Sequence, residues 1–221
     1  MPARGFTLIE MLVVVSIMVI ITTIALLGQT SFNRSLTLTD TAYTIAFSVR
    51  EAQALGLSSR TFASTQNAGY GVHFASGTLN AYSLFADISP VAAGNVQVAA
   101  TCPGHAIGTG PEAKPGDCIQ TLASEIVRTY TFNGGFKLKS FCGIETSTAT
   151  QRCNGYIDAL DIVYLRPNTQ SVVTAVRAGV RVPLSDATIR VQSPDGTVER
   201  CIYVSRVGQV SVHAKGETEC P

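Results

Sequence analysis

The sequence has no tryptophan, and only 14% of its residues are charged, with a formal net charge of +1. Such totals give no sign of a strongly basic nucleic-acid face or of an acidic tail. With so few charges, the surface must be built largely from Thr, Ser, Asn, Gln and Gly. The 19 glycines supply many turns, and the whole composition favours a β-rich head over a helical enzyme core.

Cysteine is absent before Cys102, and no Cys-x-x-Cys motif occurs. The cysteines and histidines form no zinc-ligand pattern, so a metal site is the weaker interpretation, and neither a metal nor another cofactor is expected. Six cysteines favour disulfides, which imply a head that folds outside the cytoplasm. Neighbours in sequence are the expected pairs, namely Cys102 with Cys118, Cys142 with Cys153, and Cys201 with Cys220.

Charge is also scarce in the run Phe6 to Leu27, where Glu10 is the only charged residue. About 20 apolar residues span a bilayer as a helix. Arg4 precedes the run, which favours an amino end in the cytoplasm and a head on the far side. A secretory signal is the alternative, but its apolar region is shorter and ends in an Ala-x-Ala-like site. The end of this run, Ile24 to Gly28, is a poor site of that kind.

Proline is missing from Phe6 to Gly56, so nothing obvious breaks a helix there. Apolar or small residues continue beyond the apolar run in alternating steps of four and three, which place them on one helix face. They are Leu38, Ala42, Ile45, Val49, Ala52 and Gly56. We therefore expect one helix of about fifty residues, transmembrane over 6–28 and amphipathic over 29–58. Arg50 and Glu51 are expected on its solvated face.

Residues 59–221 show short runs rich in Val, Ile, Tyr, Phe and Thr, which predict strands. The expected strands are 71–74, 79–86, 126–132, 136–141, 156–165, 172–182, 187–191, 201–204 and 209–213. Turn formers at 133–135 and 193–196 predict hairpin connections, and 99–116 is the expected long loop. The predicted fold class is α+β, with a long amino-terminal helix packed on a carboxy-terminal antiparallel sheet.

Glu10 is the anomaly of the apolar run. A carboxylate near the start of a membrane helix costs a few kcal/mol unless it is paired or reaches the interface. One interpretation is that Glu10 snorkels to the lipid headgroups from a shallow depth. The other is that a partner neutralises it.

The segment Gly5-Phe6-Thr7-Leu8-Ile9-Glu10-Met11-Leu12 resembles the prepilin motif of type IV pilins and type II secretion pseudopilins. In that family a membrane aspartyl peptidase cuts after the Gly and methylates the new amino-terminal Phe. The resemblance implies a leader at residues 1–5, cleavage between Gly5 and Phe6, N-methylation of Phe6, and an assembly role for Glu10. The amine of a neighbouring subunit would neutralise Glu10 where the dielectric is low.

Three looser stretches, at residues 46–56, 69–74 and 201–212, look like the stem end, first strand and closing strand of H-type pseudopilins and FimT-type minor pilins. Some FimT-type pilins bind DNA through basic residues near the closing strand, often an Arg directly after the Gly. That position is Gln209 here, although Arg206 and Lys215 lie nearby. A few scattered cations predict weak, salt-sensitive binding at most.

The remaining candidates form no clear catalytic or metal pattern. His73, His105 and His213 are far apart in sequence and show no arrangement of nucleophile, base and orienting group, so no catalytic residue is expected. Asp158 and Asp161 flank apolar residues. Their hard oxygen ligands would suit calcium, but exposed strand or edge positions that discourage pairing with other chains are the favoured interpretation.

The expected function is that of a structural subunit, a minor pilin or pseudopilin that assembles through its helix and presents its head to partners. Expected partners are other pilin or pseudopilin subunits, the prepilin peptidase, the inner-membrane assembly machinery and membrane lipid. A DNA-uptake pilin is the alternative. A membrane-anchored envelope enzyme is a further one, for which the sequence offers no convergent polar site.

The cysteines generate the first prediction, that the exported head has no free thiol and loses stability on reduction. Each short-loop disulfide contributes roughly 2–4 kcal/mol, so three together supply a large part of a small domain's stability. Thiol counting in denaturant, with and without reductant, measures the number directly. Two or more free thiols in the native protein would contradict the disulfide interpretation.

Overall fold

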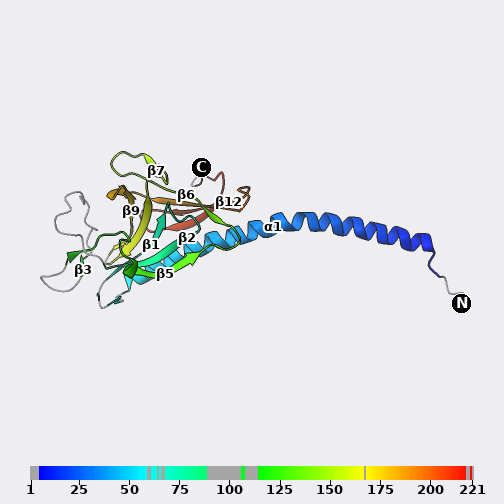
Figure 1. Ribbon diagram of the computed structural model, residues 1–221, viewed down its shortest axis with the longest axis horizontal. Coiled ribbons are helices and arrows are strands. Elements are labelled where there is room, and N and C mark those ends of the chain that lie inside the picture. Colours follow the sequence, from blue (N-terminus) through cyan, green and yellow to red (C-terminus); the bar gives the residue numbers. More distant parts are fainter. Residues whose placement is uncertain are drawn as a thin grey trace. The chain divides into compact units, whose positions relative to one another are not determined.

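The structure is a computed structural model that describes residues 5–58, 61–63, 65, 68–88, 106–107, 114–166, 168–217 and 220. The chain forms two compact units, Met1–Thr37 and Leu38–Pro221. One helix, α1 (Leu8–Leu57), contributes residues to both units (Figure 1). At 50 residues it has the length expected from the sequence. The unit that contains the sheets begins at Leu38, within the segment that the sequence assigns to the amphipathic stem.

In the first unit, α1 supplies a segment, Leu8–Leu26, that is long and apolar enough to cross a membrane. The hydroxyl groups in this segment have hydrogen-bond partners within the helix itself. Ser16 donates to the carbonyl of Leu12, and Thr23 donates to the carbonyl of Val19. Such bonds to the preceding turn satisfy hydroxyls that lipid could not.

In the second unit, α1 buries the face that the sequence periodicity predicts. Leu38, Ala42, Ile45, Val49 and Ala52 are fully buried there. The alanines among them leave room for the helix backbone to come close to the sheet. Closest of all is Gly56, where an added Cβ atom would lie 2.2 Å from the carbonyl oxygen of Tyr164. The predicted amphipathic helix is therefore confirmed, with a glycine at its tightest contact.

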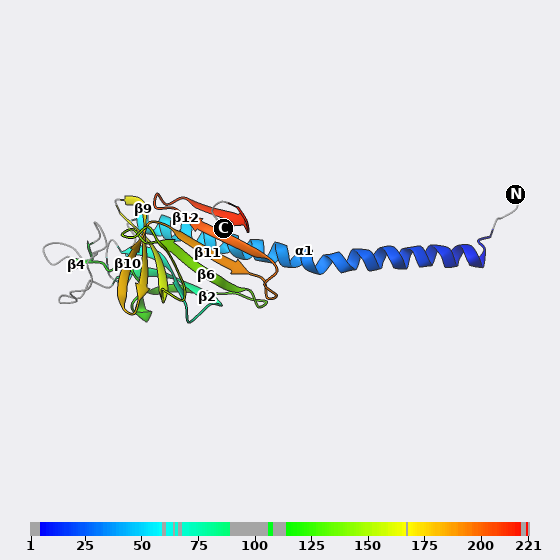
Figure 2. The same ribbon diagram turned by 90° about the horizontal axis from the view of Figure 1, so that it is seen from above.

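Two antiparallel sheets and one small ribbon make up the rest of the described head. The six-stranded sheet consists, in spatial order, of β10 (Val180–Leu184), β9 (Asn168–Arg177), β8 (Ala159–Leu165), β1 (Gly69–Ala75), β2 (Ala81–Asp87) and β5 (Ile126–Thr131). The five-stranded sheet consists of β13 (Val210–Ala214), β12 (Glu199–Val204), β11 (Ala187–Gln192), β6 (Lys137–Ile144) and β7 (Gln151–Cys153). Figure 2 shows β12, β11 and β6 side by side. The ribbon pairs β3 (Ala106–Ile107) with β4 (Lys114–Pro115). The α+β class is thus confirmed.

Each of the nine predicted strands overlaps an observed strand, with three differences. The predicted strand 172–182 is two strands, because Ala178 and Gly179 both adopt positive φ and turn the chain between β9 and β10. The short β7 was missed, since its three residues are not apolar enough to give a strand signal. The predicted long loop 99–116 contains the strands of the β3–β4 ribbon, and its other residues up to 113 lie outside the described part.

The main core lies among α1 and the two larger sheets, because alternate residues of each strand point inward. Val72 and Phe74 of β1, Phe141 of β6 and Ile189 of β11 are fully buried members of it. A second, smaller cluster lies on the six-stranded sheet. Its strand residues alternate along the chain with those that belong to the main core. It contains Phe85, Val163, Leu165 and Cys118.

Gly56 generates the second prediction. The methyl group of Gly56→Ala would collide with the Tyr164 carbonyl, so the helix must shift away from β8, and overpacking of this kind costs about 1–3 kcal/mol. Gly77→Ala is the matched control, because nothing lies within 4 Å of its added Cβ atom. Denaturant unfolding of the full-length protein in detergent measures both. Equal midpoints for Gly56→Ala and the wild type would contradict the packing described here.

Candidate functional site

The amino-terminal motif is built around the start of α1. The helix begins at Leu8, and the backbone N–H of Glu10 donates to the side-chain oxygen of Thr7 at 3.3 Å. Thr7 therefore caps the helix, and a Thr with a Glu three residues later is the sequence pattern of a capping box. Sequence reasoning overlooked this role of Thr7, although the Thr-x-x-Glu spacing was available to find it.

The residues on which processing and assembly would depend are open to partners. Gly5 and Phe6 precede the helix, and Phe6 is 75% exposed. Glu10 lies in the first turn of α1 and is also exposed. A carboxylate in the first turn favours the helix, because backbone N–H groups there carry partial positive charge. The motif therefore presents a non-helical cleavage segment directly before an apolar helix whose first turn carries one acid.

Residues 1–26 match the family model described as the prokaryotic N-terminal methylation motif. The chain has the amino terminus of a type IV pilin-like protein. No curated protein and no solved structure matches it. The match covers the leader and the apolar part of α1, so the likeness of the head to H-type pseudopilins and FimT-type pilins stays a prediction.

Disulfides tie the head at two described places. Cys142 and Cys153 are bonded and face each other across β6 and β7. Cys201 of β12 is bonded to Cys220. These are two of the three pairs expected from sequence. Cys118 is also disulfide-bonded, and its expected partner, Cys102, lies outside the described residues.

The two candidate DNA contacts do not converge. Arg206 precedes β13 and Lys215 follows it, so a strand of five residues, about 17 Å long, separates them. Lys215 Nζ lies 3.3 Å from Oε1 of Glu199, an oxygen that also accepts from Lys139 Nζ at 2.6 Å. Burial opposes ionisation of Glu199, but the bonds from both lysines outweigh it and lower the pKa of this carboxyl. The charge of Lys215 is thus offset locally.

Asp161 and Asp158 do not form a calcium site, and the expectation of two exposed edge positions was wrong for Asp161. Asp161 is fully buried on the interior strand β8 and accepts from Nδ1 of His73 at 2.8 Å. Burial lowers the pKa of His73, but the charge of Asp161 and its hydrogen bond together outweigh burial, so the pKa is raised. Asp158 is exposed and accepts from the backbone N–H of Ala178.

Two of the histidines contact acids in the described part of the head. Ser83 on β2, His73 on β1 and Asp161 on β8 are lateral neighbours in the six-stranded sheet, and the side chain of His73 bonds to Asp161. His213 lies between a hydroxyl and an acid, because its Nε2 is 2.8 Å from Oγ of Ser211 and its Nδ1 is 2.8 Å from the carboxylate of Glu217, which is 53% exposed. His105 lies outside the described residues.

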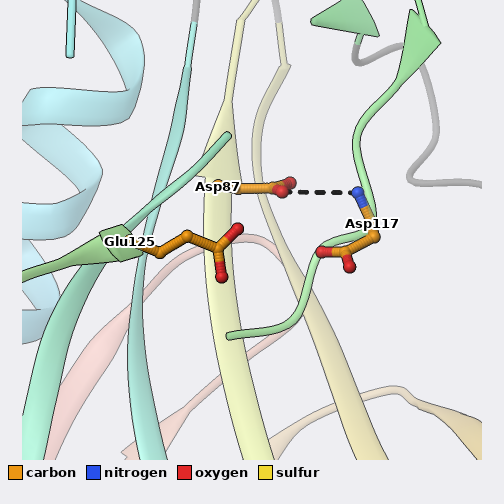
Figure 3. A group of neighbouring side chains, drawn as sticks. All are labelled: Asp87, Asp117 and Glu125. Atoms are coloured by element: carbon orange, nitrogen blue, oxygen red, sulfur yellow. Dashed lines mark hydrogen bonds between the residues drawn. The ribbon is translucent and has the colours of Figure 1, made fainter. Parts of the chain in front are cut away.

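Three buried carboxylates that sequence reasoning missed lie together beside the second apolar cluster. The oxygens of Asp87, Asp117 and Glu125 come within 4.8 Å of one another (Figure 3). Their spacing would fit around a cation, but the oxygens already accept hydrogen bonds from backbone N–H groups, and Arg181 lies 3.2 Å from Asp117. We assign no metal to this group. No sequence signal could find it, since the three residues come from different elements.

The helical segment of the second unit also presents an apolar surface. Tyr43 and Phe47 are 58% and 68% exposed, and they line a shallow groove between α1 and the edge strand β13. Arg50 lines the same groove and donates to the carbonyl of Val210. Glu51 accepts from the hydroxyl of Tyr130. Arg50 and Glu51 were predicted to lie on a solvated helix face. In the structure their side chains instead form hydrogen bonds with residues of the two sheets.

Proposed function

We propose that this pilin-like protein is a structural subunit, a minor pilin or pseudopilin, that enters a filament by its amino-terminal helix and presents its head to partners. The observation that carries the proposal is the single acid, Glu10, in the first turn of an apolar helix that follows a prepilin-type junction. An ordinary membrane anchor has no use for a carboxylate at that place, because the group is costly in lipid.

The proposed processing explains why Gly5 and Phe6 flank the junction. The peptidase would remove residues 1–5 and methylate the amine of Phe6 in the inner membrane. Gly5 and Phe6 lie before the first helical residue, so the bond between them can be reached without unwinding α1. The apolar segment Leu8–Leu26 would hold the precursor in lipid until the assembly machinery takes it up.

Charge pairing gives Glu10 its role in assembly. Cleavage creates a positive amine at Phe6, and a low dielectric makes both this amine and the Glu10 carboxylate costly when each is alone. Pairing Glu10 of one subunit with the amine of another neutralises both and sets the register between neighbouring stems. Exposed apolar residues on the water-side part of α1, including Tyr43 and Phe47, provide further surface for a neighbour.

The alternative functions have less support. A DNA-uptake role would need several converging cations, whereas Lys215 is offset by Glu199 and Arg206 lies at the other end of β13. An envelope enzyme would need a nucleophile, a base and an orienting acid in a site that excludes water. Ser211, His213 and Glu217 are in contact, but they lie at the edge strand β13 and Glu217 is 53% exposed.

The third prediction tests the role of Glu10. In Glu10→Ala the backbone N–H still reaches Thr7, so the helix cap is kept, and membrane insertion and cleavage should proceed as in wild type. Incorporation into filaments should fail, because the mutant leaves a buried ammonium without its partner at a cost of about 3–5 kcal/mol. Quantifying the processed protein in sheared filaments or cross-linked complexes, at equal expression, measures incorporation.

Asp40→Ala is the matched control, because it removes an exposed acid from the same helix outside the apolar segment. It should assemble normally. A snorkelling Glu10 would instead make Glu10→Ala neutral or slightly favourable. Normal incorporation of Glu10→Ala would therefore refute the pairing role, whereas loss of cleavage in the same variant would point to recognition by the peptidase.

A further inference from the structure

The outer face of the six-stranded sheet carries a row of polar residues that filament assembly does not explain. Asp161 of β8 lies opposite His73 of β1. On the other side of His73 lies Ser83 of β2, followed by Thr129 of β5. The neighbours of these residues along each strand pack in the main core, so the four side chains point to the opposite face. They form a polar line across four adjacent strands.

A hollow lies beside this row, because the next residues on the same face are small. Ala75 of β1 lies opposite Ala159 of β8, and the register of β1 with β2 places Ala81 on its other side. The three alanines leave space that larger side chains would fill. The result is an open cavity of about 220 Å³, whose polar lining consists of His73, Thr78, Ser83, Gln120 and Thr129.

Residues 117–125 pass over this face before the chain enters β5, and Gln120 among them lines the cavity. The backbone N–H of Gln120 donates to Oδ1 of Asp161 at 3.2 Å. Its side-chain Nε2 donates to the carbonyl of Leu122 at 2.9 Å, just before the 3₁₀ turn η2 (Ala123–Glu125). These two bonds fix Gln120 in place, so the cavity is formed by the fold itself, as binding pockets commonly are.

Several hydrogen-bonding groups in the cavity have unused capacity. Ser83 is 6% exposed, and its hydroxyl bonds to no other described residue. Within the same part of the chain, the hydroxyls of Thr78 and Thr129 and the Nε2 of His73 also have no partner. Polar groups that are largely buried lose free energy when they make no hydrogen bond. The cavity therefore favours an occupant that can bond to several of them at once.

The charge at the cavity is balanced. His73 is the one residue of the described lining that can be charged near neutral pH, and its Nδ1 lies 2.8 Å from Oδ1 of Asp161. Asp161 is fully buried, so it offsets the charge of His73 from behind and is itself out of reach of a ligand. Among the described lining residues, no charge is left over to select an anion or a cation. A neutral occupant fits best, since it adds no uncompensated charge.

We propose that this cavity binds a single neutral sugar unit, which would give the head a binding activity of its own. Sugar hydroxyls donate and accept, and so do the hydroxyls of Ser83 and Thr129 and the carboxamide of Gln120. A sugar hydroxyl also suits Nε2 of His73 in either protonation state, because it can accept from an N–H or donate to a bare nitrogen.

The shape of the cavity agrees with its chemistry. Ala75 and Ala81 offer small apolar surfaces to the C–H groups of a ring. The volume of about 220 Å³ is below the roughly 300–1,000 Å³ of pockets for drug-sized molecules, which limits the occupant to about one ring. The site involves neither Glu10 nor a filament, so the failure of either proposal leaves the other standing.

The fourth prediction is that the full-length protein binds at least one of four sugars, namely glucose, galactose, mannose and N-acetylglucosamine. A small open site with a few neutral hydrogen bonds should give a Kd of about 1 mM. Saturation-transfer NMR and calorimetry measure binding. The detergent must be zwitterionic and without a sugar headgroup, since a glycoside detergent would compete for the site.

Two variants test the location. Ser83→Ala removes one hydroxyl from the lining and should weaken binding roughly two- to tenfold, the worth of one neutral hydrogen bond. Ala75→Val keeps every polar group, suits a strand and fills the hollow, so binding should be lost. Ser211→Ala is the matched control, because its hydroxyl contacts His213 on the other large sheet, and it should bind as wild type does. Denaturant midpoints show whether each variant is folded.

Three results would overturn the proposal. One is the absence of saturable binding for all four sugars, and another is unchanged binding in both Ser83→Ala and Ala75→Val. The third is displacement of the sugar by acetate or methylammonium at equal concentration, because the site would then select charge. Displacement by a disaccharide that ends in the same unit supports the site and identifies the end of a glycan as the source. Failure of the disaccharide to compete supports the site for the free sugar.

Discussion

The structure depends on one helix that meets two different requirements along its length. Over Leu8–Leu26 every backbone group must be satisfied within the segment, because lipid offers no hydrogen bonds, and a continuous α-helix with hydroxyls bonded to the preceding turn achieves this. From Leu38 onward the same helix presents small and branched side chains to the sheets, ending at Gly56 against the Tyr164 carbonyl. The position of the head strands follows from this contact, since a larger residue would hold the helix away from β8.

The two faces of the six-stranded sheet are built on different principles. The inner face joins the main apolar core, whose members pack in any ionisation state. The outer face combines a small apolar cluster around Cys118 with four buried carboxylates. Buried charges of one sign are costly unless they are paired or protonated. The outer face is therefore held by hydrogen bonds and ion pairs to carboxylates as well as by apolar packing, whereas the inner face is held by apolar packing.

Much of the fold could be predicted because local signals carry it. The helix face from Leu38 to Gly56 and most strands follow from periodicity, and the prepilin-type motif is contiguous in sequence. The buried carboxylates could not be predicted, because Asp87, Asp117 and Asp161 approach only through strand pairing and the path of residues 117–125 over the sheet. Asp161 was expected at an exposed edge because a strand pattern does not reveal which strand lies inside a sheet. The turn at Ala178 was missed for a similar reason, since alanine gives no sign of a positive φ.

The central claim is that the amino terminus is processed as in type IV pilins, and the intact mass of the protein from membranes tests it most directly. In cells with an active prepilin peptidase, the mass should correspond to a chain that begins at Phe6 with one added methyl group, and in cells without the peptidase it should correspond to the unprocessed precursor. A chain that keeps Met1 in the presence of the peptidase, or one that is cut near Gly28, would contradict the account.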